Sequence, residues 1–133
     1  MKWNLSALAA GLGLLISVPV LAHHSFEAEY DSNKPINITG SVTKVEWMNP
    51  HARFYVDVKD EKGVVTNWNF ELGSPNVLTR QGWRRDSLKV GDTVTVEGYM
   101  AKDGARLANA RRVTLADGRK VFAGSAAGEG GPQ

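Results

Sequence analysis

The sequence predicts an all-β fold, a small five-stranded OB-fold-like Greek-key barrel with one short helix between its third and fourth strands. Three observations lead to this prediction. Five segments alternate apolar and polar residues with a period of two, which is typical of half-buried antiparallel strands. Short runs rich in Gly and Asp separate most of these segments, and a helix start follows the third one. An antiparallel β-sandwich is the alternative, but it normally needs more strands than the chain offers.

The first strand is expected over residues 36–47. Its alternation holds as far as Val42, after which the phase slips and Val45 and Trp47 take the apolar positions. A slip close to Gly40 predicts a β-bulge or a sharp bend, which a strand needs when it curls around a small barrel.

The second and third strands are expected over residues 52–59 and 64–72, joined by a turn. The apolar face of the pair is expected to point inward and carries Phe54, Val56, Val58, Trp68, Phe70 and Leu72. The polar face is expected to point outward and carries Arg53, Tyr55, Asp57, Asn67, Asn69 and Glu71. That outward face is too acidic and too poor in aromatic residues for single-stranded nucleic acid, so no nucleic-acid partner is expected.

A short helix is expected after the third strand, because a serine cap at Ser74 followed by Pro75 favours a first helical turn. Gly82 is its expected stop. The last two strands are expected over residues 93–99 and 106–115, with residues 121–122 pairing back on the fifth.

Residues 1–22 are typical of a secretory signal peptide cleaved after Ala22. Lys2 gives the positive start, residues 5–18 form the apolar run, and Pro19 precedes the small residues of the cleavage region. The apolar run is shorter than the roughly 20 residues of a membrane-spanning helix. The mature protein is therefore expected in the periplasm or secreted, with no stable membrane anchor.

Removing these 22 residues from 133 leaves 111, which is the size of one small domain. We divide it into an N-terminal arm (23–35), a barrel (36–123) and a disordered tail (124–133). Without Lys2, 15 basic residues face 14 acidic ones, so the mature chain has no strong basic field. The chain contains no cysteine, which excludes disulfides, thiolate metal sites and a cysteine nucleophile.

Five blocks of the chain occur in the order AHHSFEAEYD, ITGSVTKVEWMNPH, VTNWNFELGSPNVLTRQGW, LKVGDTVTVEGYMAKDG and ANARRVTLADGRKVFAG. Together they resemble a family of short exported bacterial proteins that is described as a domain of unknown function. The resemblance covers nearly the whole mature chain. It implies export, a mature start at HHSF and an OB-like barrel, and it implies no activity.

Cleavage after Ala22 would make His23 the first residue, followed by His24. A terminal histidine offers two nitrogen donors, its free α-amine and its imidazole, and His51 is the third imidazole of the chain. Three nitrogen ligands in a planar arrangement favour Cu(II). We therefore name His23 and His51 as candidate metal ligands, with His24 as a variant in which the amine, the intervening amide and the second imidazole chelate the ion.

This ligand set resembles the histidine brace of lytic polysaccharide monooxygenases and of some periplasmic copper carriers in its ligand logic alone. Glu27, Glu29 and Asp31 of the arm are candidate oxygen ligands or hydrogen-bond partners of the ligands. The alternative interpretation is plain: the paired histidines are polar terminal residues, and His51 hydrogen-bonds at a strand end.

The sequence shows no nucleophile elbow, phosphate loop, zinc-protease motif or dinucleotide fingerprint, so we name no catalytic residue. The function expected is that of an exported, non-enzymatic Cu(II)-binding protein. The alternative is a metal-free OB-type interaction or accessory module for an envelope protein or glycan. A secreted copper enzyme is the least favoured reading.

Overall fold

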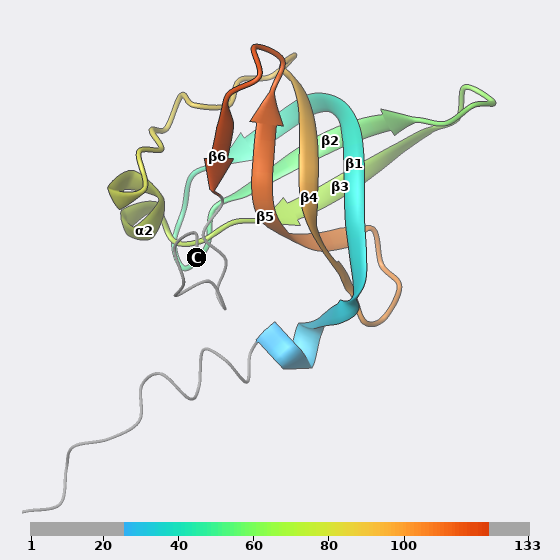
Figure 1. Ribbon diagram of the computed structural model, residues 1–133, viewed down its shortest axis with the longest axis horizontal. Helices are drawn as coiled ribbons and strands as arrows, with labels where there is room; N and C mark the ends of the chain where they lie inside the picture. The colour runs from blue at the N-terminus through green and yellow to red at the C-terminus, as the bar shows by residue number, and fades with distance from the viewer. Residues whose placement is uncertain (1–25, 123–133) are drawn as a thin grey trace, which may run out of the picture.

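The computed structural model describes residues 26–122 (Figure 1). One helical turn at residues 26–29 precedes the first strand. In chain order the elements are β1 (Tyr30–Glu46), β2 (Arg53–Lys59), β3 (Val65–Glu71), α2 (Pro75–Arg80), β4 (Thr93–Ala101), β5 (Leu107–Leu115) and β6 (Lys120–Phe122).

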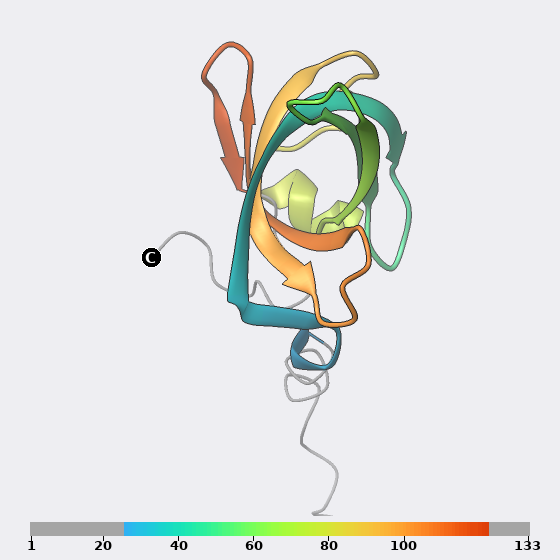
Figure 2. The ribbon, with the colours of Figure 1, turned by 90° about the vertical axis from the view of Figure 1, so that its right-hand side faces the viewer.

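The strands form one sheet in the order β3-β2-β1-β4-β5-β6, and β3 also pairs with β5. That additional pairing is parallel and runs from Asn69 opposite Leu107 to Glu71 opposite Asn109, whereas the other pairings are antiparallel. The first five strands therefore close into a ring, which Figure 2 shows end on. This ring, with α2 inserted between β3 and β4, confirms the predicted all-β, OB-fold-like barrel.

The long strand β1 connects the two halves of the ring, because it pairs with β4 along its first part and with β2 along its last. Its pairing with β2 shifts register between Val42 and Lys44, which confirms the predicted bulge. A Cβ atom on Gly40 would lie 2.3 Å from the backbone oxygen of Asp57. Glycine is therefore required where β1 bends across β2.

The inward faces of the strands form one apolar core, and the helix closes its end. Trp68 is only 7% exposed and packs in this core, as its phase predicts. The Ser74 hydroxyl accepts a hydrogen bond from the Val77 amide at 3.4 Å, which confirms the predicted helix cap. Leu78 of α2 and the nearby Trp83 are buried in the same core.

The N-terminal part of the fold differs from the prediction. β1 begins at Tyr30 rather than at residue 36, and residues 26–29 are helical rather than extended. Tyr30 pairs with Ala101, but the register shifts before pairing resumes at Pro35, so the alternating pattern that marks a strand is interrupted there. The signal peptide, His23, His24 and the tail at 124–133 lie outside the described residues.

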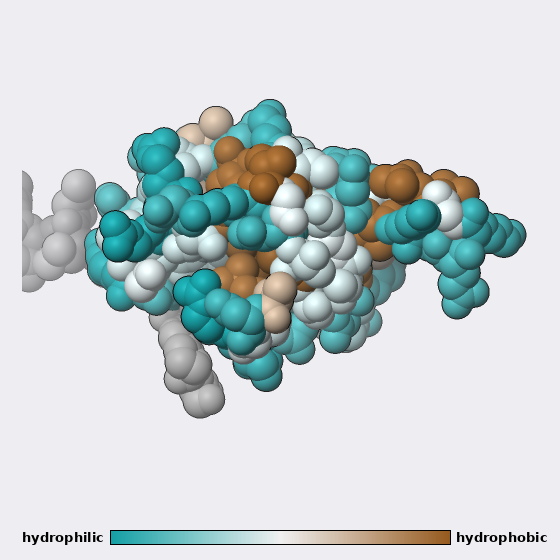
Figure 3. All heavy atoms as spheres, turned by 90° about the horizontal axis from the view of Figure 1, so that it is seen from above, coloured by the Kyte–Doolittle hydropathy of each residue, from teal (hydrophilic) through white to brown (hydrophobic). Residues whose placement is uncertain are grey.

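The short last strand confirms the expected return pairing, with Val121 opposite Val113 of β5. Apolar surface gathers at the end of the molecule where the β2–β3 hairpin projects (Figure 3), and Val64 and Val65 are each 56% exposed there. Within residues 26–122, no helix is long and apolar enough to span a membrane.

Candidate functional site

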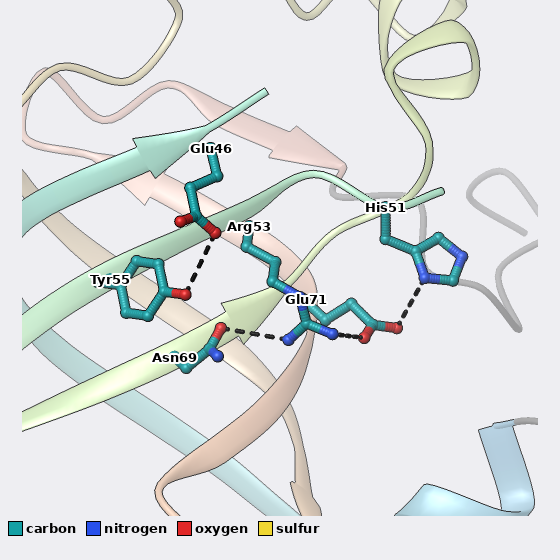
Figure 4. Close-up of polar contacts among 6 residues, drawn as sticks. All are labelled: Glu46, His51, Arg53, Tyr55, Asn69 and Glu71. Carbon is teal, nitrogen blue, oxygen red and sulfur yellow. Dashed lines mark hydrogen bonds and ion pairs between the residues drawn. The ribbon is translucent and has the colours of Figure 1, made fainter. Parts of the chain in front are cut away.

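A buried carboxylate lies at the centre of the candidate site. The β2–β3 register places Arg53 directly opposite Glu71 on the outer face of the barrel. The Arg53 Nη2 atom donates to Glu71 Oε2 at 2.6 Å, and Nη1 donates to Asn69 Oδ1 at 3.4 Å (Figure 4). A charged hydrogen bond of 2.6 Å is short, so Arg53 holds one carboxylate oxygen firmly.

His51 lies just before β2 and contacts the other oxygen of this carboxylate. Its Nδ1 atom is 3.3 Å from Glu71 Oε1, and its side chain is 29% exposed. Backbone hydrogen bonds from Ala52 to Gly73 and from Leu72 to Ala52 continue the β2–β3 pairing past the strand ends. His51 therefore projects from a fixed backbone. Figure 4 shows its second ring nitrogen directed away from Glu71.

The side chain of Glu71 is only 4% exposed, although its strand position faces outward. Tyr30 of the N-terminal segment, which we define as residues 26–30, lies against this carboxylate. Phe26 and Tyr30 of this segment form a small apolar cluster outside the barrel with Tyr99, Ala101 and Leu107. The Phe26 and Tyr99 rings meet edge to face with centroids 6.1 Å apart.

Lys102, in the turn after β4, ties the N-terminal segment to the barrel. Its backbone amide donates to the Glu29 carbonyl at 2.9 Å. Its ammonium group donates to the Glu27 carbonyl. The segment is therefore held by backbone contacts as well as by its two aromatic anchors.

The charges under the segment influence one another. Burial raises the pKa of the Tyr30 hydroxyl, and the negative charge of Glu71 raises it further. The pKa of the Glu29 carboxyl is raised by burial and then by Glu71, against the opposing charges of Arg53 and His51. The N-terminal segment thus lies within electrostatic range of His51.

Asn109 completes the surroundings of Glu71. It is the register partner of Glu71 on β5, it is fully buried, and neither atom of its side-chain amide has a hydrogen-bond partner among the described residues. The buried hydroxyl of Tyr30 lies beside Glu71, and its side-chain interaction with that carboxylate contributes to its raised pKa. Arg53 and His51 lie on different oxygens of the Glu71 carboxylate, at 2.6 Å from Oε2 and 3.3 Å from Oε1.

Of the acidic side chains that the sequence suggested as partners of the metal ligands, Glu29 lies within electrostatic range of His51, whereas Asp31 contacts its own strand. Asp31 accepts from the Asn33 amide at 2.9 Å and lies 3.8 Å from the Lys34 ammonium, so it engages its own strand. Sequence reasoning treated Glu71 as one more solvated residue and missed its contact with His51. Within residues 26–122 no group of three or more His, Asp or Glu side chains gathers as a metal-binding cluster.

Comparison with curated proteins gives no match. Among solved structures, the chain is similar to the dimeric N-terminal domain of PriB protein from Thermoanaerobacter tencongensis, with 18% identity and a TM-score of 0.41. The similarity covers 63% of this chain and 97% of that one. The fold assignment rests on the strand pairing described above. The sequence profile of a family of unknown function (DUF6152) matches residues 13–110, and the chain belongs to that family.

Proposed function

We propose that this protein is exported to the periplasm and there binds Cu(II), without enzymatic activity, through the amine and imidazole of a mature N-terminal His23 and the imidazole of His51. The observation that carries the proposal is the position of the N-terminal segment. It is anchored on the barrel within electrostatic range of His51, and its chain direction leads back to His23.

Chain length limits how far His23 can lie from the N-terminal segment. Three peptide units separate Phe26 from His23, a reach of about 10 Å at roughly 3.3–3.6 Å per residue. Phe26 is buried and Lys102 holds the carbonyls of Glu27 and Glu29, so the start of this short tether is fixed. His24 and Ser25 are the two residues between Phe26 and His23 in the sequence.

The donor chemistry selects the metal. Imidazole and amine nitrogens suit Cu(II), which leads the divalent affinity series for such ligands. The Nδ1 atom of His51 faces Glu71, and the other ring nitrogen points away from it and is the one available to a metal ion. His24 offers the alternative chelate through the intervening amide.

The test is a Cu(II) titration of mature protein that begins at His23, with copper affinity measured by competition against a chelator of known affinity. The matched control is the same mature protein acetylated at the His23 amine, which converts the amine into an amide and creates no new terminal amine. We expect acetylation and His51→Ala each to weaken binding by about tenfold or more, since each removes a nitrogen donor. Equal affinity for mature and acetylated protein would refute the proposal.

A metal-free interaction module is the second candidate, and the β2–β3 hairpin favours it. Val64 and Val65 are exposed at its tip. Within the described residues, β5 pairs with β3 only at Asn69–Glu71, which leaves the outer edge of Val65–Trp68 open. An open β-strand edge is a template for strand addition by an envelope protein.

Chelator-treated protein used as bait on envelope extract tests this candidate. Capture of the same partner by wild type and His51→Ala, and its loss in Val65→Lys, would support a hairpin-based module. Partner binding that disappears on chelation would contradict it.

A further inference from the structure

We propose that Glu71 and Arg53 act as a positioning pair that fixes His51 in its Nδ1–H tautomer and so directs the Nε2 lone pair outward as the metal ligand. The inference rests on the proposed function for its metal, but the tautomer it assigns is a property of the metal-free protein.

The argument begins with donors and acceptors. An ionised carboxylate has two oxygens that only accept hydrogen bonds. Glu71 presents Oε2 to Arg53 at 2.6 Å and Oε1 to His51 at 3.3 Å. A neutral imidazole that faces a carboxylate oxygen with Nδ1 must carry its proton there, which leaves Nε2 as the acceptor or ligand nitrogen.

The 3.3 Å separation is at the long end for such a bond. Hydrogen bonds at functional sites are often long in the unliganded protein and tighten when the ligand is present. A metal on Nε2 would draw electron density from the ring and make Nδ1–H a stronger donor. In metal sites generally, a histidine ligand donates its other ring N–H to a carboxylate or carbonyl, which fixes ring orientation.

Arg53 has a separate task in this arrangement. A buried carboxylate needs a counter-charge, and Arg53 supplies one that is always protonated. The Glu71–Arg53 pair is therefore neutral as a unit, and His51 does not have to serve as the counter-ion. A permanently charged partner on one oxygen leaves the other oxygen for an uncharged imidazole.

Burial makes the orientation specific. The side chain of Glu71 is 4% exposed beneath the N-terminal segment, so water has little access to compete for its oxygens. Asn109 lies opposite Glu71 on β5, and its side-chain amide has no hydrogen-bond partner among the described residues. The buried Tyr30 hydroxyl also interacts with the carboxylate. In free solution an imidazole favours the opposite Nε2–H tautomer, so an Nδ1–H tautomer at His51 is diagnostic of the carboxylate.

The experiment reads the His51 tautomer by ¹⁵N NMR in metal-free mature protein at pH 8, where an ordinary histidine is neutral. His51→Ala identifies the signals. We expect the Nδ1–H tautomer in wild type and its loss in Glu71→Gln. A glutamine has a single oxygen for two donors, and Arg53 competes for it.

A double variant then separates positioning from simple structural damage. In Arg53→Met/Glu71→Gln the competing donor is gone, so the glutamine oxygen is free to accept from His51 and the Nδ1–H tautomer should return. The double variant also leaves no unpaired buried charge, so it remains informative if the single variant Glu71→Gln fails to fold. Glu97→Gln, which removes a carboxylate from the exposed ion pair with Arg112, is the matched control and should leave the tautomer unchanged.

Copper provides the second readout. We expect Glu71→Gln to weaken Cu(II) affinity by about 10- to 100-fold and to change the nitrogen hyperfine pattern in the electron paramagnetic resonance spectrum, with recovery in the double variant. An Nε2–H tautomer in wild type would overturn the inference whatever the metal does. A wild-type Nδ1–H tautomer with copper binding that is indifferent to His51→Ala would refute the proposed function and leave the tautomer assignment standing.

Discussion

Two arginine–glutamate pairs bridge neighbouring strands on the outside of this barrel, and they lie in contrasting environments. Arg53 and Glu71 are 2.6 Å apart with side chains 28% and 4% exposed. Arg112 and Glu97 are 3.2 Å apart with side chains 51% and 42% exposed. The pairs share residue types and cross-strand geometry. What differs is the N-terminal segment, which covers Glu71 but leaves Glu97 in solvent.

The comparison shows that burial, rather than residue type, determines how strongly a carboxylate on the outer face of the barrel depends on its protein partners. An exposed pair exchanges its partners with water and contributes between 0 and about 1 kcal/mol. A covered carboxylate has lost its water, so its protein partners become obligatory. At Glu71 one of those partners is His51, the imidazole that the sequence singled out.

The largest expected effect comes from removing the covered arginine. Arg53→Gln leaves Glu71 buried without its counter-charge, and breaking a buried pair in this way costs about 3 kcal/mol of unfolding free energy or more. Arg112→Gln removes the same kind of group from the exposed pair and should cost less than about 1 kcal/mol. Urea denaturation of the two variants measures the difference. Equal losses would show that the N-terminal segment does not change the environment of Glu71.

Loosening the N-terminal segment should reduce the difference in stability cost between Arg53→Gln and Arg112→Gln. Phe26→Ala deletes an anchor of the N-terminal segment, and we expect a loss of about 2 kcal/mol, below the 3–5 kcal/mol of a core position, because this cluster lies outside the barrel. With water admitted to Glu71, Arg53→Gln should cost about 1 kcal/mol less in the Phe26→Ala background than in wild type. In the matched double-mutant cycle, the losses of Phe26→Ala and Arg112→Gln should simply add. Coupling energies of equal size in both cycles would contradict the inference that the N-terminal segment shields Glu71 from water.

Much of the barrel could be predicted because its signals are local. Period-two alternation placed β2 and β3 to within about a residue of their observed ends, and Ser74-Pro75 identified the start of α2. The bulge near Gly40 was visible because a phase slip in the apolar pattern lay beside a glycine. Each of these features depends on residues that are close in the chain.

The candidate site could be predicted only in part, because its geometry depends on contacts distant in sequence. His51 was recognised from its residue type and its place after Pro50. The role of Glu71 was missed, since its period-two position indicates a solvated residue until the N-terminal segment is known to fold over it. The sequence did place Arg53 and Glu71 on the outward faces of two strands joined by a hairpin, which was enough to suggest an ion pair between them. These positions did not reveal that Glu71 is buried beside Tyr30 of the N-terminal segment.

The smallest expected effect is a pH dependence of the unfolding free energy that originates in Glu29 of the N-terminal segment. The pKa of Glu29 is raised above its ordinary value of 4.5 by burial and by the charge of Glu71, with Asp103 adding to the rise and Arg53 and His51 opposing it. The folded state therefore holds the Glu29 proton more tightly than the unfolded state does. Between the unfolded and the folded pKa the folded protein binds more protons, so this contribution to stability is greatest at low pH and is lost as the pH rises through the folded pKa.

Glu29→Gln should accordingly stabilise the protein at pH 7, by less than about 1 kcal/mol because the side chain is largely exposed and screened. It should also flatten the dependence of the unfolding free energy on pH just above 4.5, relative to wild type. Glu61→Gln, which removes the same charge from the turn between β2 and β3, is the matched control. The decisive comparison is made in the Glu71→Gln background, which removes the negative charge facing Glu29 and keeps the opposing charge of Arg53. There the stabilisation by Glu29→Gln should shrink, and an undiminished effect would mean that burial alone, without the covered carboxylate, raises the pKa of Glu29.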